Sequence, residues 1–153
     1  MFQKTTEEKD TVYTFYPFDF EPYDEQELEL RRLVELVQET VEYDWISCFK
    51  VDPYTGELAE IELEEKGFNL IDSIRFDSGN GLAAWVAKQQ RPVLLSAVHK
   101  SQRFRSNPVK SFICCPVIRN QETIGVLNLG HSTVNAYTKE TLNQLLQLVN
   151  GIA

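Results

Sequence analysis

The stretch IRFDSGNGLAAWVAKQQRPVLLS, residues 74–96, decides the fold. It begins at the end of a short apolar segment and runs into a Gly-Asn-Gly turn. After the turn, Leu82, Trp85 and Val86 recur with the spacing of one helical face. A proline then closes the helix, and residues 93–95 have the length of a brief strand. The stretch therefore predicts a strand, a tight turn, a short helix and another strand.

A second informative stretch is SFICCPVIRNQETIGVLNLGH, residues 111–131. Residues 112–118 and 123–129 are apolar and are separated by the polar sequence RNQE, which predicts two strands joined by a turn. Residues 96–110, between the two informative stretches, show no period and predict a long connection. Long connections in compact domains are uncommon, and they often carry function.

The rest of the chain supplies terminal helices and a hairpin. A helix is predicted from Asp24, and a final helix is predicted with Thr138 as its N-cap. Between them, residues 45–51 and 58–65 predict two strands around a Pro-to-Gly turn, and residues 70–76 predict a third. Each terminal helix has one apolar stripe, formed by Leu30, Leu33, Val34, Val37 and Val41 in the first and by Leu142, Leu145, Leu146, Val149 and Ile152 in the last.

The order α-β-β-β-α-β-loop-β-β-α predicts an α+β domain with a central antiparallel sheet of five or six strands. We expect this domain to span residues 25–153. Residues 1–24 form a separate N-terminal arm, because residues 11–23 hold six aromatic side chains and two prolines. Prolines disfavour a helix or a central strand, and so many rings are expected to pack on the domain or on a second subunit.

Composition excludes several classes of protein. With 23 acidic and 15 basic residues, the net charge of −8 argues against nucleic-acid binding. No apolar run approaches the roughly 20 residues of a membrane span, and the polar first residues do not resemble a secretory signal. The three cysteines contain no CxxC pair, which fits a reducing compartment, and we expect a cytoplasmic protein.

Neither a metal nor a reactive thiol is expected. Cys114 and Cys115 are adjacent on a predicted strand, so their side chains point to opposite faces and do not easily chelate one metal. Together with Cys48, they are expected to be buried free thiols. The two histidines, His99 and His131, are far apart in the sequence and do not suggest a metal site.

Both quoted stretches resemble the GAF family of sensory domains. Residues 74–96 resemble the strand, Gly-x-Gly turn, short helix and following strand of that family. Residues 111–131 resemble its pair of core strands, with a serine at the start, a proline five residues on and "iGvL" in the second strand. The resemblance implies a fold related to PAS domains, with the terminal helices on one face of the sheet. The short helix and the long loop are implied to cover a pocket on the other face.

The candidate ligand-binding residues come from the short helix, the long loop and one face of strand 111–117. If that face points toward the implied pocket, the set is Trp85, His99, Arg103, Phe104, Ser111, Ile113 and Cys115. The opposite face, with Phe112 and Cys114, is an open alternative. Within residues 96–110 there are five basic or histidine side chains and no acidic one, which favours an anionic or polar ligand. Arg103 is the expected anion contact, because a guanidinium binds carboxylate or phosphate with two hydrogen bonds.

The resemblance implies a sensory or regulatory domain that binds a small molecule and does not catalyse a reaction. Its signal would pass through the terminal helices to an output domain such as a histidine kinase, a diguanylate cyclase or a transcriptional activator. The free-methionine sulfoxide reductases of the family need cysteines before the Gly-x-Gly turn and in the helix or loop, and this sequence has none there.

Two alternative functions remain open, and a homodimer is expected. A module for dimerisation and relay without a ligand is the first alternative, and a redox enzyme resembling those reductases is the second. No cofactor is identified, although a nucleotide-like ligand fits. A homodimer through the terminal helices is expected because Leu28, Leu36 and Leu148 lie off the apolar stripes.

Overall fold

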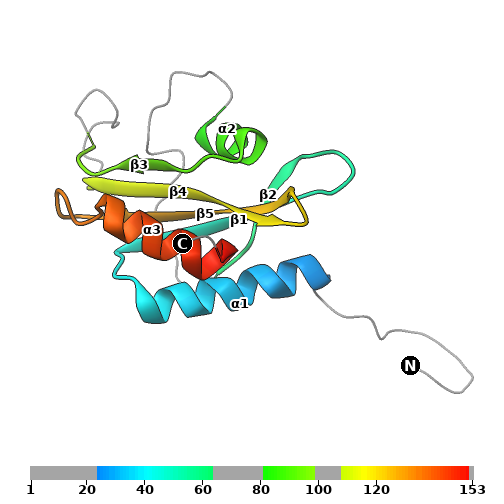
Figure 1. Ribbon diagram of the computed structural model, residues 1–153, viewed down its shortest axis with the longest axis horizontal. Helices are drawn as coiled ribbons and strands as arrows, with labels where there is room; N and C mark the ends of the chain where they lie inside the picture. Colours follow the sequence, from blue (N-terminus) through cyan, green and yellow to red (C-terminus); the bar gives the residue numbers. More distant parts are fainter. Residues whose placement is uncertain (1–23, 64–80, 99–107, 152–153) are drawn as a thin grey trace, which may run out of the picture.

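The computed structural model describes residues 24–63, 81–98 and 108–151 (Figure 1). Its helices are α1 (Glu25–Thr40), α2 (Leu82–Gln89) and α3 (Lys139–Asn150). Its strands are β1 (Trp45–Val51), β2 (Leu58–Glu60), β3 (Val93–Leu95), β4 (Ser111–Arg119) and β5 (Glu122–His131). All paired strands are antiparallel, in the order β2-β1-β5-β4-β3, so β5 lies at the centre of the sheet.

The helices form two layers around the sheet. In Figure 1, α1 and α3 lie on one face and α2 lies on the other. The predicted α+β class, antiparallel sheet and division of helices are therefore confirmed. The aromatic arm, the strand expected at residues 70–76 and most of the long connection (99–107) lie outside the described residues.

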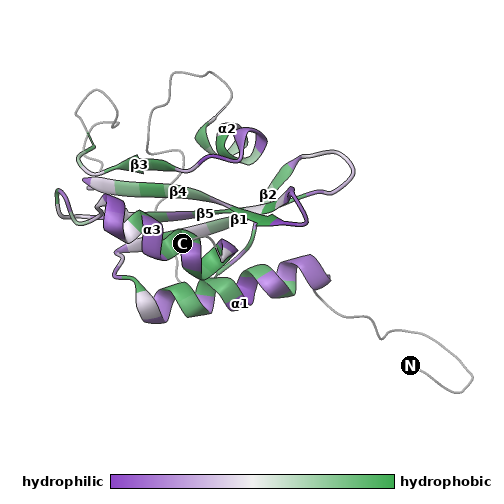
Figure 2. Cartoon of the chain, viewed as in Figure 1, coloured by the Kyte–Doolittle hydropathy of each residue, from purple (hydrophilic) through white to green (hydrophobic). Residues whose placement is uncertain are grey.

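The terminal helices form where their sequences supply caps and an apolar stripe. Asp24 caps α1 by accepting a hydrogen bond from the Glu27 backbone N–H at 2.7 Å. Thr138 and Thr141 cap α3 reciprocally. The stripe residues with the least exposure are Leu30, Val34, Val37, Leu145 and Val149. Figure 2 shows the hydrophilic first turn of α1 and the hydrophobic strands between the helix layers.

Leu30 of α1 fits against β5 because Gly125 has no side chain. A Cβ at Gly125 would lie 2.6 Å from Leu30 Cδ2 and 2.8 Å from the Phe49 carbonyl oxygen. Any larger residue would therefore push α1 and β1 away from β5.

Alternation along β4 and β5 divides the interior into two clusters. Ile113, Cys115, Val117, Leu127 and Leu129 pack with α1 and α3, on the side we call the terminal-helix face. The opposite side, the α2 face, is built from Leu82, Ala83, Val86, Val98, Val109, Phe112, Cys114 and Val126. Successive residues of one strand thus serve different layers.

The hairpin of β1 and β2 is confirmed, but its second strand is shorter than predicted. The ladder ends at Glu60 rather than Glu65. Beyond it, Ile61 donates its backbone N–H to the Cys48 carbonyl at 2.8 Å and is buried in the terminal-helix cluster with the partly buried Leu63. The hydrogen bonding to β1 therefore continues one residue past Glu60, while the apolar side chains of this segment pack into the core.

Candidate functional site

The α2 face is the candidate site because its buried polar side chain, Asn128, has an oxygen without a hydrogen-bond partner, whereas the buried Ser111 on the terminal-helix side is hydrogen-bonded. Its helix is fixed over the β4–β5 hairpin by side-chain bonds. Thr123 Oγ1 donates to the Ala87 carbonyl at 2.8 Å, and Gln90 Nε2 donates to the Gln121 carbonyl at 3.1 Å. These bonds hold the end of α2, where Gln90 adopts a left-handed conformation.

A row of paired residues crosses the sheet beneath this layer. The register places Ser47, Asn128, Cys114 and Val93 side by side on β1, β5, β4 and β3. Asn128 is fully buried and Ser47 is 7% exposed. Asn128 Nδ2 donates to Ser47 Oγ at 3.1 Å, whereas Asn128 Oδ1 is buried without a hydrogen-bond partner. An unpaired buried acceptor costs about 1–3 kcal/mol, so this amide is unusual in a finished core.

The next row on the same face is largely apolar. Trp45, Gly130 and Phe112 are register partners, so aromatic rings lie on either side of a residue with no side chain. Phe49, two residues beyond Ser47, also packs against the α2-face cluster. Aromatic and polar groups therefore meet around Asn128, as they do in many ligand sites.

The thiols on and behind this face are poor nucleophiles. Burial raises the pKa of Cys48 and that of Cys115 to about 12. It also raises the pKa of Cys114 well above its ordinary value, and the neighbouring Cys115 adds to this shift. All three cysteines are free and buried, as the sequence analysis expected. Thiolate chemistry needs a lowered pKa and access, and neither is present.

The face assignment of the predicted site residues needs a correction. Ile113 and Cys115 belong to the terminal-helix cluster, whereas the alternative pair, Phe112 and Cys114, lies on the α2 face. The reason is strand parity: a shift of one residue moves every side chain to the other face, and the apolar sequence FICC does not mark the parity.

Ser111 has a structural role on the terminal-helix side. Its Oγ accepts a hydrogen bond from the Tyr137 backbone N–H at 3.0 Å and donates to the Leu95 carbonyl at 3.4 Å. Tyr137 in turn donates its hydroxyl to the Glu42 carbonyl at 2.9 Å. This chain of bonds joins the end of α1 to the segment before α3, so the Ser111 hydroxyl is occupied by the framework.

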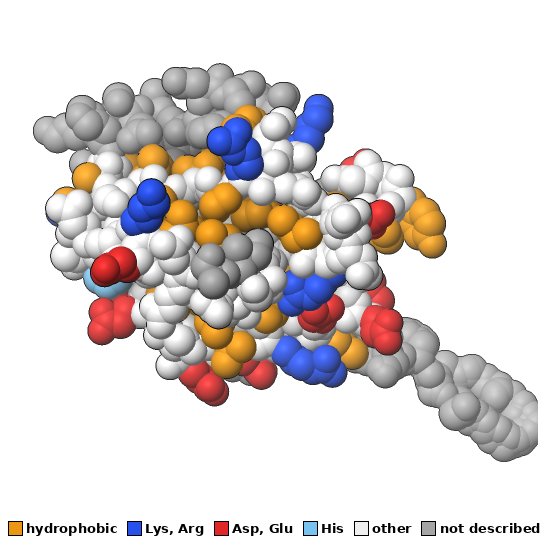
Figure 3. Space-filling view, viewed as in Figure 1, with side chains coloured by type: hydrophobic (Ala, Val, Ile, Leu, Met, Phe, Trp, Pro, Cys, Tyr) orange, Lys and Arg blue, Asp and Glu red, His pale blue; other side chains and the backbone are white. Residues whose placement is uncertain are grey.

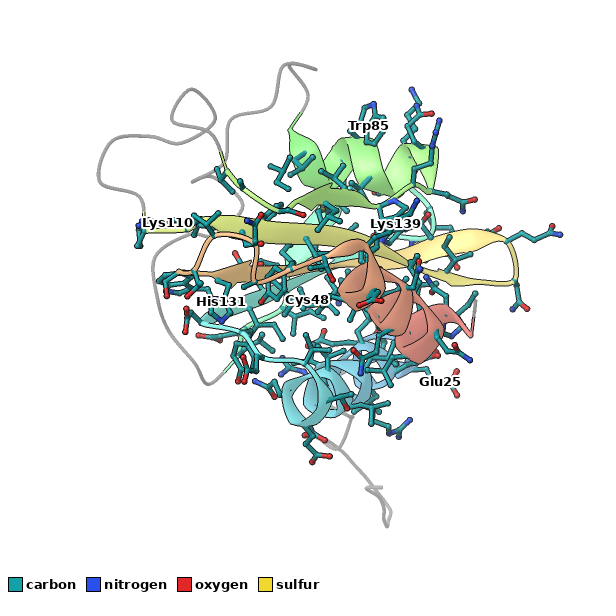
Figure 4. The ribbon with its side chains drawn as sticks, turned by 60° about the vertical axis from the view of Figure 1, so that its left-hand side comes forward. Glu25, Cys48, Trp85, Lys110, His131 and Lys139 are labelled. Atoms are coloured by element: carbon teal, nitrogen blue, oxygen red, sulfur yellow. The ribbon has the colours of Figure 1, made fainter. Side chains whose placement is uncertain are left out.

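Among the other candidates, Trp85 is described and three residues are not. Trp85 is partly buried against the α2-face cluster, and its ring projects from α2 away from the strands (Figure 4). His99, Arg103 and Phe104 lie outside the described residues. The sequence analysis missed Asn128 and Ser47, although a lone asparagine within VLNL was a usable sign of a polar group in the core.

A hollow lies on the opposite layer, where α1 begins. It has a volume of about 460 Å³ and is lined by Glu25, Gln26, Glu29, Arg32, Arg119 and Ile124. Figure 3 shows basic and acidic side chains gathered at this end of the molecule. Arg119 pairs with Glu29 and donates to the Val149 carbonyl at 2.8 Å, so its guanidinium already ties α3 to α1. Arg119, which lines the hollow, is therefore already engaged in holding the two helices together.

Within the described ranges, no three His, Cys, Asp or Glu side chains gather as a metal site would require. In the same described ranges, no helix is both long enough and apolar enough to cross a membrane.

Comparison with known proteins identifies the family. The GAF domain profile matches residues 22–153, and the chain belongs to the GAF domain family, a sensory and regulatory fold found in signalling proteins. A search of the curated proteins finds no match.

Several solved structures share the fold. A type II free methionine-R-sulfoxide reductase from Thermoplasma acidophilum is 20% identical, with a TM-score of 0.60 over 83% of this chain and 91% of that one. The GAF domain of a two-component sensor histidine kinase from Bacillus halodurans is 18% identical, with a TM-score of 0.59 over 83% and 90%. A GAF domain/HD domain protein from Geobacter sulfurreducens is 12% identical, with a TM-score of 0.58 over 83% and 88%.

Proposed function

We propose that this GAF domain binds a small molecule on its α2 face and relays the binding through α1 and α3 to an output domain. The arrangement of β5 is the observation that carries the proposal. Asn128 lies on the α2 face, while its neighbours Leu127 and Leu129 pack on the terminal-helix face. A displacement of β5 by a ligand would therefore reach both layers directly. The output domain would be a histidine kinase, a diguanylate cyclase or a transcriptional activator, in the cytoplasm.

Native mass spectrometry of the full chain, purified without denaturation, tests the ligand-binding half of the proposal. A retained or added small molecule that increases the mass and protects β5 amides from hydrogen exchange would support it. The alternative is a dimerisation and relay module without a ligand. That alternative predicts the bare chain mass and unchanged exchange with a metabolite library.

The relay half of the proposal involves a homodimer through the terminal helices. Leu36 on α1 is 41% exposed, although it is a large apolar side chain. We expect sedimentation equilibrium to give twice the chain mass of 17.7 kDa, and we expect Leu36→Glu to give a folded monomer. A wild-type monomer at micromolar concentration would remove this half and leave ligand binding untouched.

We also propose that the domain is not an enzyme. The support is the burial of all three thiols and the raised pKa of each. The similar fold of a methionine sulfoxide reductase makes redox activity the alternative.

Thiol labelling tests the catalytic alternative. Native protein should react with a thiol reagent far more slowly than unfolded protein, because burial blocks access and disfavours the thiolate. Rapid labelling of one cysteine in the native state would favour redox chemistry instead.

A further inference from the structure

The amide of Asn128 is the most informative group that the framework leaves incomplete. The following inference rests on the proposed ligand-binding function and concerns the chemistry of the group that reaches the sheet. We propose that Asn128 and Ser47 recognise an uncharged, planar group with a hydrogen-bond donor beside an acceptor. An amide, a lactam or the edge of a nucleobase has this pattern.

The hydrogen-bonding capacity of Asn128 gives the pattern. A side-chain amide offers two N–H donors and an oxygen with two lone pairs. Asn128 donates from Nδ2 to Ser47 Oγ at 3.1 Å, and its Oδ1 has no partner. The amide therefore keeps an unpartnered acceptor oxygen, and its nitrogen carries a second N–H besides the one given to Ser47. If the amide turns over, its nitrogen takes the unpartnered place, and a group with both a donor and an acceptor still pairs with it.

Two-point pairing by asparagine is well suited to such groups. An asparagine amide binds an adenine edge with two hydrogen bonds, and any cis amide offers the same geometry. Ser47 holds the asparagine in place through its Oγ. Its hydroxyl also remains a donor, so a further acceptor on the ligand would fit beside the amide.

The uncharged surroundings of the buried Asn128 favour a neutral ligand group. In the described parts of the chain, the buried polar residues are Ser47, Ser111 and Asn128, and none of them is ionisable. A carboxylate or ammonium beside Asn128 would lose its hydration without gaining a buried partner of opposite charge. The anion contact that the sequence predicts at Arg103 therefore concerns a different part of the ligand.

The apolar neighbours favour a flat ring. On β1, Trp45 and Phe49 flank Ser47 on the same face, and Phe112 lies across Gly130 from Trp45. Aromatic side chains pack well on planar groups, and a glycine in a strand permits close approach to the backbone.

A matched pair of probes tests the inference on the full chain. Nicotinamide carries the amide, and 3-acetylpyridine has the same ring and carbonyl without an N–H donor. In ¹⁵N-labelled protein, nicotinamide should shift the Asn128 side-chain resonances in a saturable way. We expect 3-acetylpyridine and nicotinate to bind about ten-fold more weakly or not at all.

Variants separate recognition at Asn128 from binding elsewhere. Asn128→Leu should weaken nicotinamide binding about ten-fold, whereas Asn143→Ala, at an exposed asparagine of α3, should leave it unchanged. If Asn128→Leu does not fold, Ser47→Ala and the probe pair on wild-type protein still decide the question. Equal binding of nicotinamide and 3-acetylpyridine, or no binding of nicotinamide, would overturn the inference.

The failure of this inference differs from the failure of the proposed function. A ligand retained in native mass spectrometry that leaves the Asn128 resonances unshifted would overturn the role of Asn128 and keep the sensor. A chain that retains no ligand and relays nothing would remove both.

Discussion

The two faces of the sheet differ in whether their buried side chains are fully packed and hydrogen-bonded. On the terminal-helix face, β4 and β5 contribute Ile113, Cys115, Val117, Leu127 and Leu129 to one apolar cluster beneath two capped helices. On the α2 face, the same strands contribute a buried asparagine whose oxygen has no partner. The comparison shows that alternate residues of the same strands differ in role: one set completes an apolar core, and the other includes a polar group whose oxygen is left without a partner.

The helices repeat this difference. Asp24 caps α1 and Thr138 caps α3 through side-chain hydrogen bonds. By contrast, α2 has eight residues and begins at Leu82. Its N-cap is Gly81, whose φ of 83° suits glycine and which supplies no side-chain hydrogen bond. A short helix without a cap contributes little stability of its own, so α2 depends on its contacts with the sheet.

Leu127→Ala tests the packing of the terminal-helix face and should have the largest effect on stability. Leu127 is 1% exposed at the centre of the sheet, and its truncation removes packing and leaves a cavity. We expect urea unfolding to show a loss of about 2–5 kcal/mol. A loss below about 1 kcal/mol would mean that the terminal-helix face is not the stabilising core.

Asn150→Ala tests the attachment of α3 to the sheet and should have an intermediate effect. Asn150 bridges the irregularity between Val117 and Ile118 in β4: its Oδ1 accepts from the Ile118 N–H at 2.8 Å, and its Nδ2 donates to the Pro116 carbonyl at 2.8 Å. Removing both bonds should lower the free energy of unfolding by about 1–2 kcal/mol. Asn143→Ala, on the exposed side of the same helix, is the matched control.

The sequence predicted the elements well because their signals are local. Caps at Asp24 and Thr138, the turn at Gly56 and the period of each apolar stripe depend on neighbouring residues. The end of β2 was less predictable, because it depends on where Ile61 finds space in a core built from distant segments.

The site was harder to predict because it depends on parity and pairing. FICC is apolar on both sides, so nothing in it distinguishes Ile113 from Phe112 as the α2-facing residue. The juxtaposition of Ser47 with Asn128 joins residues 81 positions apart, and only the register of β1 and β5 reveals it.

Asp44→Ala tests the hydrogen bonds between the α1–β1 connection and Ser132, and it should have a small, pH-dependent effect on stability. Asp44 Oδ2 accepts from the Ser132 hydroxyl at 2.6 Å and from its backbone N–H at 2.8 Å. These bonds lower the pKa of Asp44 below its ordinary value of 3.8. The resulting stabilisation is present above that value and is lost as the pH falls through the lowered pKa.

Because Asp44 is largely exposed, the wild type should exceed Asp44→Ala by less than about 1 kcal/mol at pH 7. Urea unfolding at a series of pH values should show this difference shrinking below pH 4. A constant difference down to pH 2 would contradict the assigned role of the carboxylate.

The unfolding free energy of Asn128→Leu tests the division between the two faces most directly. Leucine has the same branching and number of heavy atoms as asparagine, although its methyl groups are bulkier. It removes the buried oxygen that has no partner, while the Ser47 hydroxyl is left at a slightly exposed position. In the ligand-free protein we expect stability within about 1 kcal/mol of wild type, because removing the unpaired oxygen offsets the cost of fitting the bulkier side chain. A loss above about 2 kcal/mol, like that expected for the neighbouring Leu127→Ala, would contradict the claim that the framework leaves Asn128 for a ligand.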